Sequence, residues 1–203
     1  IKGLIFDLDG VLVNTKEIHF DALNLALKKV NAKEISFKDH LNIFDGLPTN
    51  KKLSILNDKK ILNKKFNSKV IKIKQEYTLK LLNKFIKFNP KIYNTFLKLS
   101  KNYKISLATN AVRKTLDLCV KKLRINKFIS YSYSNEDVSR NKPHPQVYLK
   151  CLVNMALKPS ETLIFEDSHH GVMAAQDSGC LLYTVKNILD INYSNIANVI
   201  KDL

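Results

Sequence analysis

The spacing of hydrophobic residues divides the chain into two kinds of segment. Between about residues 16 and 88, apolar residues recur at intervals of three and four, which is the spacing of amphipathic helices. This pattern predicts helices over residues 17–30, 53–62 and 70–85, separated by turns rich in Asn and Lys. On either side of this block, short apolar runs are typical of buried strands.

From residue 89 onward, predicted strands and helices alternate. Strands are expected at residues 4–6, 105–108, 128–133, 162–165 and 181–185, and helices at residues 93–100, 114–123, 146–155 and 172–177. Such alternation favours βαβ units around a parallel sheet. We therefore predict an α/β fold with a Rossmann-like parallel sheet core at residues 1–15 and 87–203. An all-helical domain at residues 16–86 is inserted into it.

Polar side chains follow three of the predicted strands at the point where each strand ends. They are Asp7 and Asp9, Thr109 and Asn110, and Glu166 and Asp167. In an open α/β sheet, ligands bind beyond the carboxyl ends of the strands. The sequence therefore predicts that these groups share one site.

Taken singly, each group has a simpler explanation. An isolated Asp-X-Asp is more often a pair of solvated acids, and Thr109 alone is more often a helix cap. Lys142, directly before Pro143 and Pro145, is by itself most simply interpreted as a surface lysine beside a turn. Adjacent carboxylates at a buried strand end repel one another, however, so Glu166 and Asp167 favour a bound cation, and oxygen ligands predict Mg²⁺. Ser168 is expected to cap the following helix.

Taken together, the motifs resemble the four motifs of the haloacid dehalogenase superfamily. They are DLDGVLVNT at residues 7–15, Thr109-Asn110, KPxPxxY from Lys142 and EDSxxG from Glu166, and they occur in the family's order. The helical block directly after the first motif is similar to the small cap domain of the branch that contains β-phosphoglucomutases. The resemblance extends over essentially the whole chain.

This resemblance implies a role for each motif residue. Asp7 is the nucleophile that forms an aspartyl-phosphate, and Asp9 is the general acid and base. Thr109 binds the transferring phosphoryl group, Lys142 neutralises charge, and Leu8 and the backbone amide of Asn110 are expected at the substrate. Mg²⁺ is expected on Asp7, the Asp9 carbonyl and Asp167, with Glu166 acting through water. The implied activity is hydrolysis of a small phosphate monoester, such as a sugar phosphate.

The resemblance also places substrate selection in the cap. His19 in TKEIHF is similar to a histidine of β-phosphoglucomutases, and the cap loop contains Gly46, Thr49 and Asn50. Those mutases carry an arginine at the position of Thr49 to bind a second phosphate. Lys51, Lys52 or Lys74 can substitute, but without the bidentate phosphate contact of a guanidinium.

A phosphatase is therefore our first expectation, and a sugar phosphomutase is the alternative. A non-catalytic binding protein with the same fold is a third hypothesis. A dehalogenase is disfavoured because members with that activity lack an acid at the position of Asp9.

The amino-acid composition limits the classes of binding partner that we expect. The net charge of +16 comes almost entirely from lysine, and no basic stripe alternates with stacking aromatics, so we expect a small phosphorylated metabolite and no nucleic acid. No run of eighteen apolar residues occurs, which predicts a cytoplasmic protein without a membrane segment. A monomer is expected. Cys119, Cys151 and Cys180 match no metal-ligand spacing and are expected to be buried thiols.

Overall fold

The computed structural model describes residues 1–203, which form two compact units. We call residues 1–14 together with 86–203 the core unit, and residues 15–85 the cap unit. None of the helices has the length and apolar character needed to cross a membrane.

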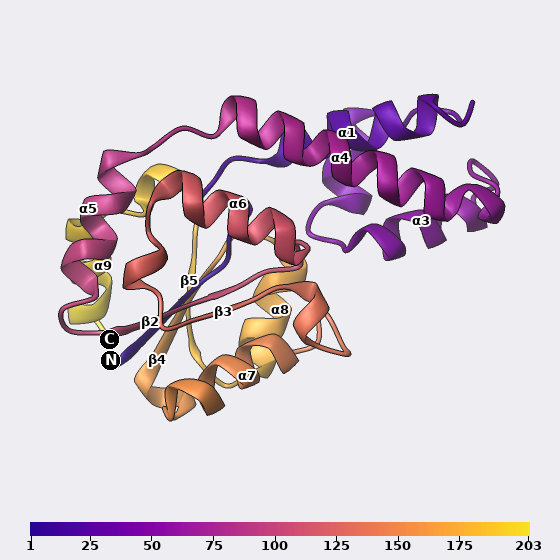
Figure 1. Ribbon diagram of the computed structural model, residues 1–203. Coiled ribbons are helices and arrows are strands. Elements are labelled where there is room, and N and C mark those ends of the chain that lie inside the picture. Colours follow the sequence, from indigo (N-terminus) through magenta and orange to yellow (C-terminus); the bar gives the residue numbers. More distant parts are fainter. The chain divides into compact units, whose positions relative to one another are not determined.

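The core unit is built on a five-stranded, all-parallel sheet with the strand order β3-β2-β1-β4-β5 (Figure 1). The strands are β1 (Gly3–Phe6), β2 (Lys104–Ala108), β3 (Tyr131–Tyr133), β4 (Thr162–Glu166) and β5 (Leu181–Thr184). The predicted α/β fold is therefore confirmed. The strand predicted from residue 128 begins three residues later, because Asn126–Phe128 forms a 3₁₀ turn.

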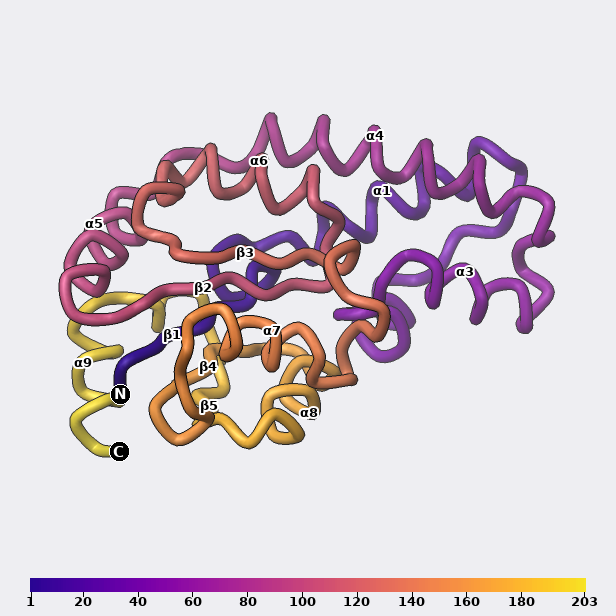
Figure 2. Tube along the Cα trace, turned by 60° about the horizontal axis from the view of Figure 1, so that its bottom comes forward, coloured from indigo at the N-terminus to yellow at the C-terminus, as the bar shows by residue number.

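Helices cover both faces of this sheet. They are α5 (Pro90–Leu99), α6 (Arg113–Leu123), α7 (Gln146–Met155), α8 (His169–Asp177) and α9 (Tyr193–Lys201), with 3₁₀ turns at Asn135–Asp137, Pro159–Glu161 and Ile188–Asp190. Figures 1 and 2 show α7 and α8 on one face and α5 and α6 on the other, and α9 packs against α5. The two chain ends lie close together in both views.

The central strand β1 explains why both faces are covered. All four of its residues are buried, as is usual for a strand in the middle of a parallel sheet. Ile5 joins the apolar cluster under α7 and α8. Its neighbour Phe6 points to the opposite face, where its ring centroid lies 5.0 Å from that of Phe96 on α5 and 4.5 Å from that of Phe165 on β4. The strand can therefore place its last residues at one fixed point of the sheet edge.

Local signals fix where several helices begin. The Asn89 side chain accepts hydrogen bonds from the Lys91 and Ile92 amides, and Pro90 occupies the first position of α5. Helix α9 was not among the predicted elements, although Asn192 caps it by accepting from the Asn195 amide.

The cap unit is helical throughout. It contains α1 (Lys16–Lys28), α2 (Phe37–Asp39), a π-helical turn at His40–Phe44, α3 (Thr49–Asp58), a 3₁₀ turn at Lys64–Phe66 and α4 (Asn67–Phe85). Helices α1 and α4 pack along each other, and the unit has its own core, which includes Leu23, Leu27, Leu53, Leu56 and Val70. The helix predicted at residues 53–62 begins earlier and ends at Asp58, and the turns over residues 37–44 were not predicted.

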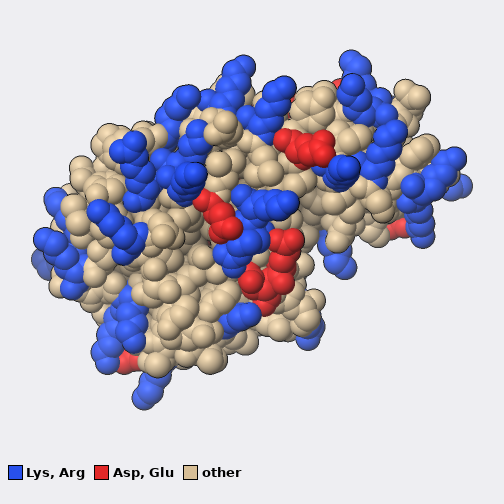
Figure 3. All heavy atoms as spheres, in the orientation of Figure 1, with Lys and Arg blue, Asp and Glu red and all other residues tan.

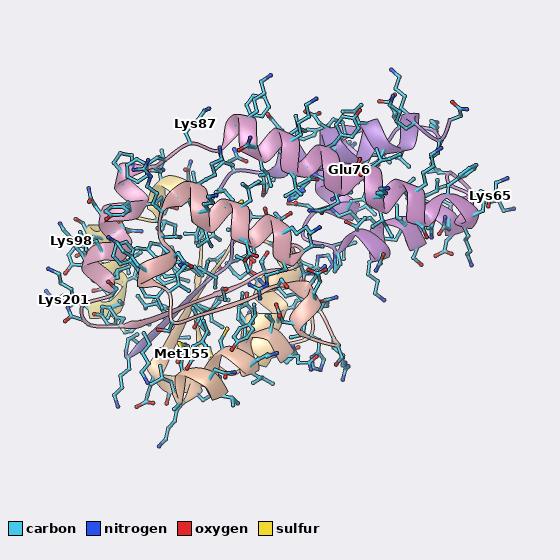
Figure 4. The ribbon with its side chains drawn as sticks, viewed as in Figure 1. Lys65, Glu76, Lys87, Lys98, Met155 and Lys201 are labelled. Carbon is cyan, nitrogen blue, oxygen red and sulfur yellow. The ribbon has the colours of Figure 1, made fainter.

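Lysines are spread over the surface of both units. Figure 3 shows blue side chains distributed across the visible face, without a single continuous basic stripe. In Figure 4, Lys87, Lys98 and Lys201 of the core unit and Lys65 of the cap unit extend away from their helices and linker. All four are exposed. The charge therefore belongs mainly to solvated side chains.

Candidate active site

The chain turns sharply just after Asp7. The Asp7 amide donates to the Phe165 carbonyl at 3.0 Å, which extends the pairing of β1 with β4 by one residue. The Leu12 and Val13 amides then both donate to the Leu8 carbonyl, and Gly10 adopts a positive φ of 86°. A Cβ atom at Gly10 would lie only 2.1 Å from Asp167 Oδ2. Glycine therefore serves both the backbone conformation and the approach of a carboxylate.

The Lys142 ammonium joins the ends of three neighbouring strands. Its Nζ lies 2.6 Å from Asp7 Oδ1 after β1, 2.5 Å from Glu166 Oε1 on β4, and 2.8 Å from the Ala108 carbonyl on β2. These contacts use all three of its N–H donors. Burial lowers the pKa of Lys142, but the two carboxylates outweigh that effect and hold its pKa above the usual value. Lys142 is therefore a permanent buried cation.

For Asp7, the effect of burial on the pKa outweighs that of the counter-ion. Burial raises the pKa of Asp7 well above its usual value, Lys142 opposes that rise, and the charge of Glu166 adds to it. The Asp9 and Asp167 carboxylates raise the pKa of Asp7 further. A carboxylate in these surroundings is a reactive one, because little solvation holds it and nearby negative charge repels it.

Glu166 is fully buried and held on both oxygens. Its Oε1 accepts from Lys142 and, at 2.7 Å, from the Tyr148 hydroxyl. Its Oε2 accepts from the Asp167 amide and from the amide and hydroxyl of Ser168. A Cβ atom at Gly171 would lie 1.9 Å from Glu166 Oε1. The expected helix cap is confirmed, since Ser168 Oγ accepts from the Gly171 amide at the start of α8.

Three carboxylates form a group that can hold a metal ion. One oxygen each from Asp7, Glu166 and Asp167 lie within 4.8 Å of one another. The donor set is entirely carboxylate oxygen, which suits Mg²⁺. Because Glu166 is already occupied by hydrogen bonds on both oxygens, Asp7 and Asp167 are the better candidates for direct ligands. The residues present therefore fit the predicted Mg²⁺ site. The Asp9 carboxylate is not part of this group.

Thr109 and Asn110 take positions that the sequence did not fully anticipate. The Thr109 amide continues the pairing of β2 with β3 by donating to the Tyr133 carbonyl. Its hydroxyl accepts from the Ala111 amide, whereas α6 begins only at Arg113, so Thr109 is not a helix cap. The Asn110 side chain exchanges two hydrogen bonds with the Lys142 backbone, at 3.1 and 3.2 Å. It thereby fastens the loop that carries the buried ammonium.

The remaining predicted residues belong to the cap unit. His19 lies on α1, Gly46 on the loop after the π-helical turn, Lys74 on α4, and Thr49, Asn50 and Lys52 on the first turn of α3. The structure thus groups the predicted residues into a core set and a cap set.

The cap also contains a histidine that sequence reasoning missed. His40 is fully buried, and neither ring nitrogen has a hydrogen-bond partner. Its ring packs against Phe20 and Phe37, with centroids at 5.6 and 6.1 Å. Burial, followed by the charge of Lys52, lowers the pKa of His40 to about 4, against a smaller opposing effect of Asp45. His40 is therefore neutral at physiological pH.

The cysteines are free thiols. Cys119 and Cys151 are buried as expected, but the expectation was wrong for Cys180, which is only partly buried. Burial raises the pKa of all three thiols. His169 is exposed and His170 is partly buried.

Comparisons with known proteins agree with this fold. The family model of haloacid dehalogenase-like hydrolases matches residues 4–185. A pyrophosphatase PpaX of Bacillus mycoides is 27% identical over 180 residues, which are 88% of this chain and 80% of that protein. The crystal structure of β-phosphoglucomutase from Clostridium difficile superposes with a TM-score of 0.84 at 20% identity, over 100% of this chain and 98% of the other. A variant of CbbY from Rhodobacter sphaeroides in complex with xylulose-(1,5)bisphosphate gives 0.79 at 16% identity, over 91% and 87%.

Proposed function

Because the chain belongs to the haloacid dehalogenase-like hydrolase family, we propose that it is a Mg²⁺-dependent phosphatase acting on a small phosphate monoester. The observation that carries this proposal is the buried Asp7 carboxylate, paired with Lys142 at 2.6 Å and set beside two further carboxylates. A structural role alone does not explain so much like charge at one buried strand end, because it costs folding free energy.

In the first step, an Asp7 oxygen attacks phosphorus in line with the leaving group. A bond forms between Asp7 and phosphorus, and the bond from phosphorus to the leaving oxygen breaks. Asp9 gives its proton to that oxygen. Lys142 neutralises charge on Asp7, and Thr109 binds the phosphoryl oxygens. Asp7, the Asp9 backbone carbonyl and Asp167 would hold Mg²⁺, with Glu166 acting through water, and the bound ion would supply positive charge at the phosphoryl group.

In the second step, water cleaves the aspartyl-phosphate. Asp9, now ionised, takes a proton from the attacking water, and the oxygen of that water becomes part of the released inorganic phosphate. Asp7 is thereby regenerated. Separate roles for the two acids agree with the arrangement after β1, where Asp7 belongs to the carboxylate group and the Asp9 side chain does not.

A small phosphorylated metabolite is the proposed substrate class. One relative is named a pyrophosphatase, and one structural neighbour contains a sugar bisphosphate. We propose that the cap residues His19, Thr49, Lys52 and Lys74 select the leaving group.

A sugar phosphomutase is the second candidate, because β-phosphoglucomutase is among the structures with the same fold. Thr49 argues against it. A threonine hydroxyl cannot replace the bidentate contact of an arginine with a second phosphate.

The two candidates differ in their products. The protein is incubated with Mg²⁺ and a panel of phosphorylated metabolites, including β-glucose 1-phosphate with a trace of the bisphosphate. Free phosphate and isomerised sugar phosphate are both measured. Phosphate release supports the phosphatase, and isomerisation without net release supports the mutase.

A variant and its control test whether turnover belongs to this site. Asp7→Asn is expected to abolish turnover, whereas Asp177→Asn, the same change at an exposed position of α8, is expected to leave it intact. The absence of turnover across the whole panel in the unmodified protein would refute the proposed function.

A further inference from the structure

One residue in the core unit touches both members of the buried ion pair. Tyr148 lies in the first turn of α7 and is fully buried against the sheet. Its hydroxyl donates to Glu166 Oε1 at 2.7 Å, and Lys142 Nζ lies 4.8 Å from the centroid of its ring. The carboxylate therefore meets the polar edge of the phenol while the ammonium lies over its face, where the ring is negative.

The hydrogen bonds of Glu166 show what the hydroxyl adds. The Oε2 atom is held by two backbone amides and by Ser168, all from the segment that follows β4. The Oε1 atom has only Lys142 and Tyr148 as donors. Without the Tyr148 hydroxyl, Lys142 is the sole group that orients Oε1, although the same ammonium must also contact Asp7 and the Ala108 carbonyl.

We propose that Tyr148 is a positioning residue that fixes the Glu166 carboxylate and the Lys142 ammonium relative to Asp7. The proposal rests on the proposed function, because the geometry it maintains is that of the carboxylate group which would hold Mg²⁺. Tyr148 contacts Glu166 and Lys142, so it would act on the reaction through these two groups. Groups that orient metal-binding residues typically change metal affinity by 10- to 100-fold when they are removed.

The first test removes only the hydroxyl. In Tyr148→Phe, we expect Mg²⁺ to bind about 10-fold more weakly, as measured by isothermal titration calorimetry without substrate. At saturating Mg²⁺ we expect kcat to fall while KM stays within about twofold, because the phosphate-binding groups are untouched. Tyr183→Phe is the matched control. Tyr183 lies on β5, and its hydroxyl accepts a hydrogen bond from the Asn195 side-chain amide at 3.3 Å, away from the carboxylate group, so Mg²⁺ affinity is expected to be unchanged.

A double-mutant cycle separates positioning from a general loss of packing. If Tyr148 acts through Glu166, then Tyr148→Phe weakens Mg²⁺ binding in the unmodified protein but has little further effect in a Glu166→Gln background. Additive effects in the two backgrounds would overturn the proposal. So would an unchanged Mg²⁺ affinity in Tyr148→Phe, even if its melting temperature fell.

The outcomes distinguish this inference from the proposed function. If the unmodified protein binds Mg²⁺ but hydrolyses no phosphate ester, the proposed function fails, and the calorimetric cycle still decides the role of Tyr148. If the unmodified protein turns over substrate and Tyr148→Phe matches it in Mg²⁺ affinity and kcat, only the positioning role fails. An unmodified protein that binds no Mg²⁺ would overturn both.

Discussion

Replacing Lys142 tests the charge balance of the site most directly. Lys142→Met keeps the length of the side chain and removes its charge and three N–H donors. Asp7 is 6% exposed and Glu166 is fully buried, so two carboxylates lose their shared counter-ion without gaining access to water. Removing one partner of a buried ion pair typically costs about 3–5 kcal/mol of folding free energy. We expect a loss of that size at pH 8 in the absence of Mg²⁺.

The pH dependence of this loss follows from the pKa of Asp7. Burial already raises the pKa of Asp7, and Lys142 is the main group that opposes the rise, so its removal raises the pKa further. A carboxyl group whose pKa is higher in the folded than in the unfolded state destabilises the protein once pH exceeds the unfolded pKa. As pH falls through the folded pKa, the group becomes protonated and the penalty disappears. The stability difference between Lys142→Met and the unmodified protein should therefore shrink between pH 8 and pH 5.

Urea unfolding followed by circular dichroism measures this difference. Lys87→Met is the matched control, because Lys87 is exposed and extends away from the chain (Figure 4), and its loss is expected to change stability by less than about 0.5 kcal/mol. Lys142→Met should also lose turnover, because a further rise in the pKa of Asp7 favours the protonated carboxyl group, which is a poor nucleophile. A stability loss below about 1 kcal/mol at pH 8, or one that stays constant down to pH 5, would refute the reasoning.

Three further changes test other parts of the structure. Burial and the charge of Lys52 lower the pKa of His40 from 6.5 to about 4. As pH falls through this range, His40 takes up a proton in the unfolded chain but not in the folded one. The free energy of unfolding should therefore fall by up to about 3 kcal/mol between pH 6.5 and 4. Urea unfolding across this range should show that slope, and His40→Phe should flatten it. Gly171→Ala places a Cβ atom within 1.9 Å of Glu166 Oε1 and should cost about 1–3 kcal/mol of folding free energy. A melting temperature equal to that of the unmodified protein would contradict this position of the Glu166 carboxylate. Asp9→Asn should reduce kcat by at least about 100-fold while calorimetry gives unchanged Mg²⁺ affinity, because the Asp9 carboxylate lies outside the metal-binding group. Loss of Mg²⁺ binding in that variant would count against separate roles for the two acids.

The parallel sheet could be predicted because its determinants are local. A run such as Leu4–Phe6 is apolar throughout, and this is the pattern of a strand buried on both faces. The polar residues that follow the strands mark the sheet edge where ligands bind. Order along the chain and hydrophobic pattern therefore contain most of the information needed for the fold class.

The errors arise where the determinants are weak or distant. Residues 126–128 form a 3₁₀ turn before β3, and the apolar pattern there does not distinguish it from an early strand. Helix α9 has an Asn cap and the apolar residues Ile196, Val199 and Ile200 at helical spacing, but it is only nine residues long and lies beyond the last predicted strand. Only Ile196 is buried. The turns over residues 37–44 depend on the packing of His40 and Phe44 in the cap unit.

Contacts within the site lie beyond sequence reasoning for a different reason. Asn110 and Lys142 are 32 residues apart, and Tyr148 and Glu166 are 18 apart. The local sequence around each of these residues gives no sign of its partner. The contacts form only because the sheet brings the strand ends together. The motif predicts that Lys142 is important, whereas the fold shows which groups hold it.

The charge balance of the site connects the metal to the nucleophile. Three carboxylates lie within 4.8 Å of one another, and one buried ammonium pairs with two of them, so two negative charges are left, which one divalent cation would neutralise. Without the cation, burial and the neighbouring acids raise the pKa of Asp7 and favour its protonated, unreactive form. Binding of Mg²⁺ would therefore ionise the nucleophile and offset the charge of an incoming phosphate at the same time. A bound divalent cation would therefore favour the ionised form of Asp7 beyond what Lys142 alone provides, as well as aid the chemical step.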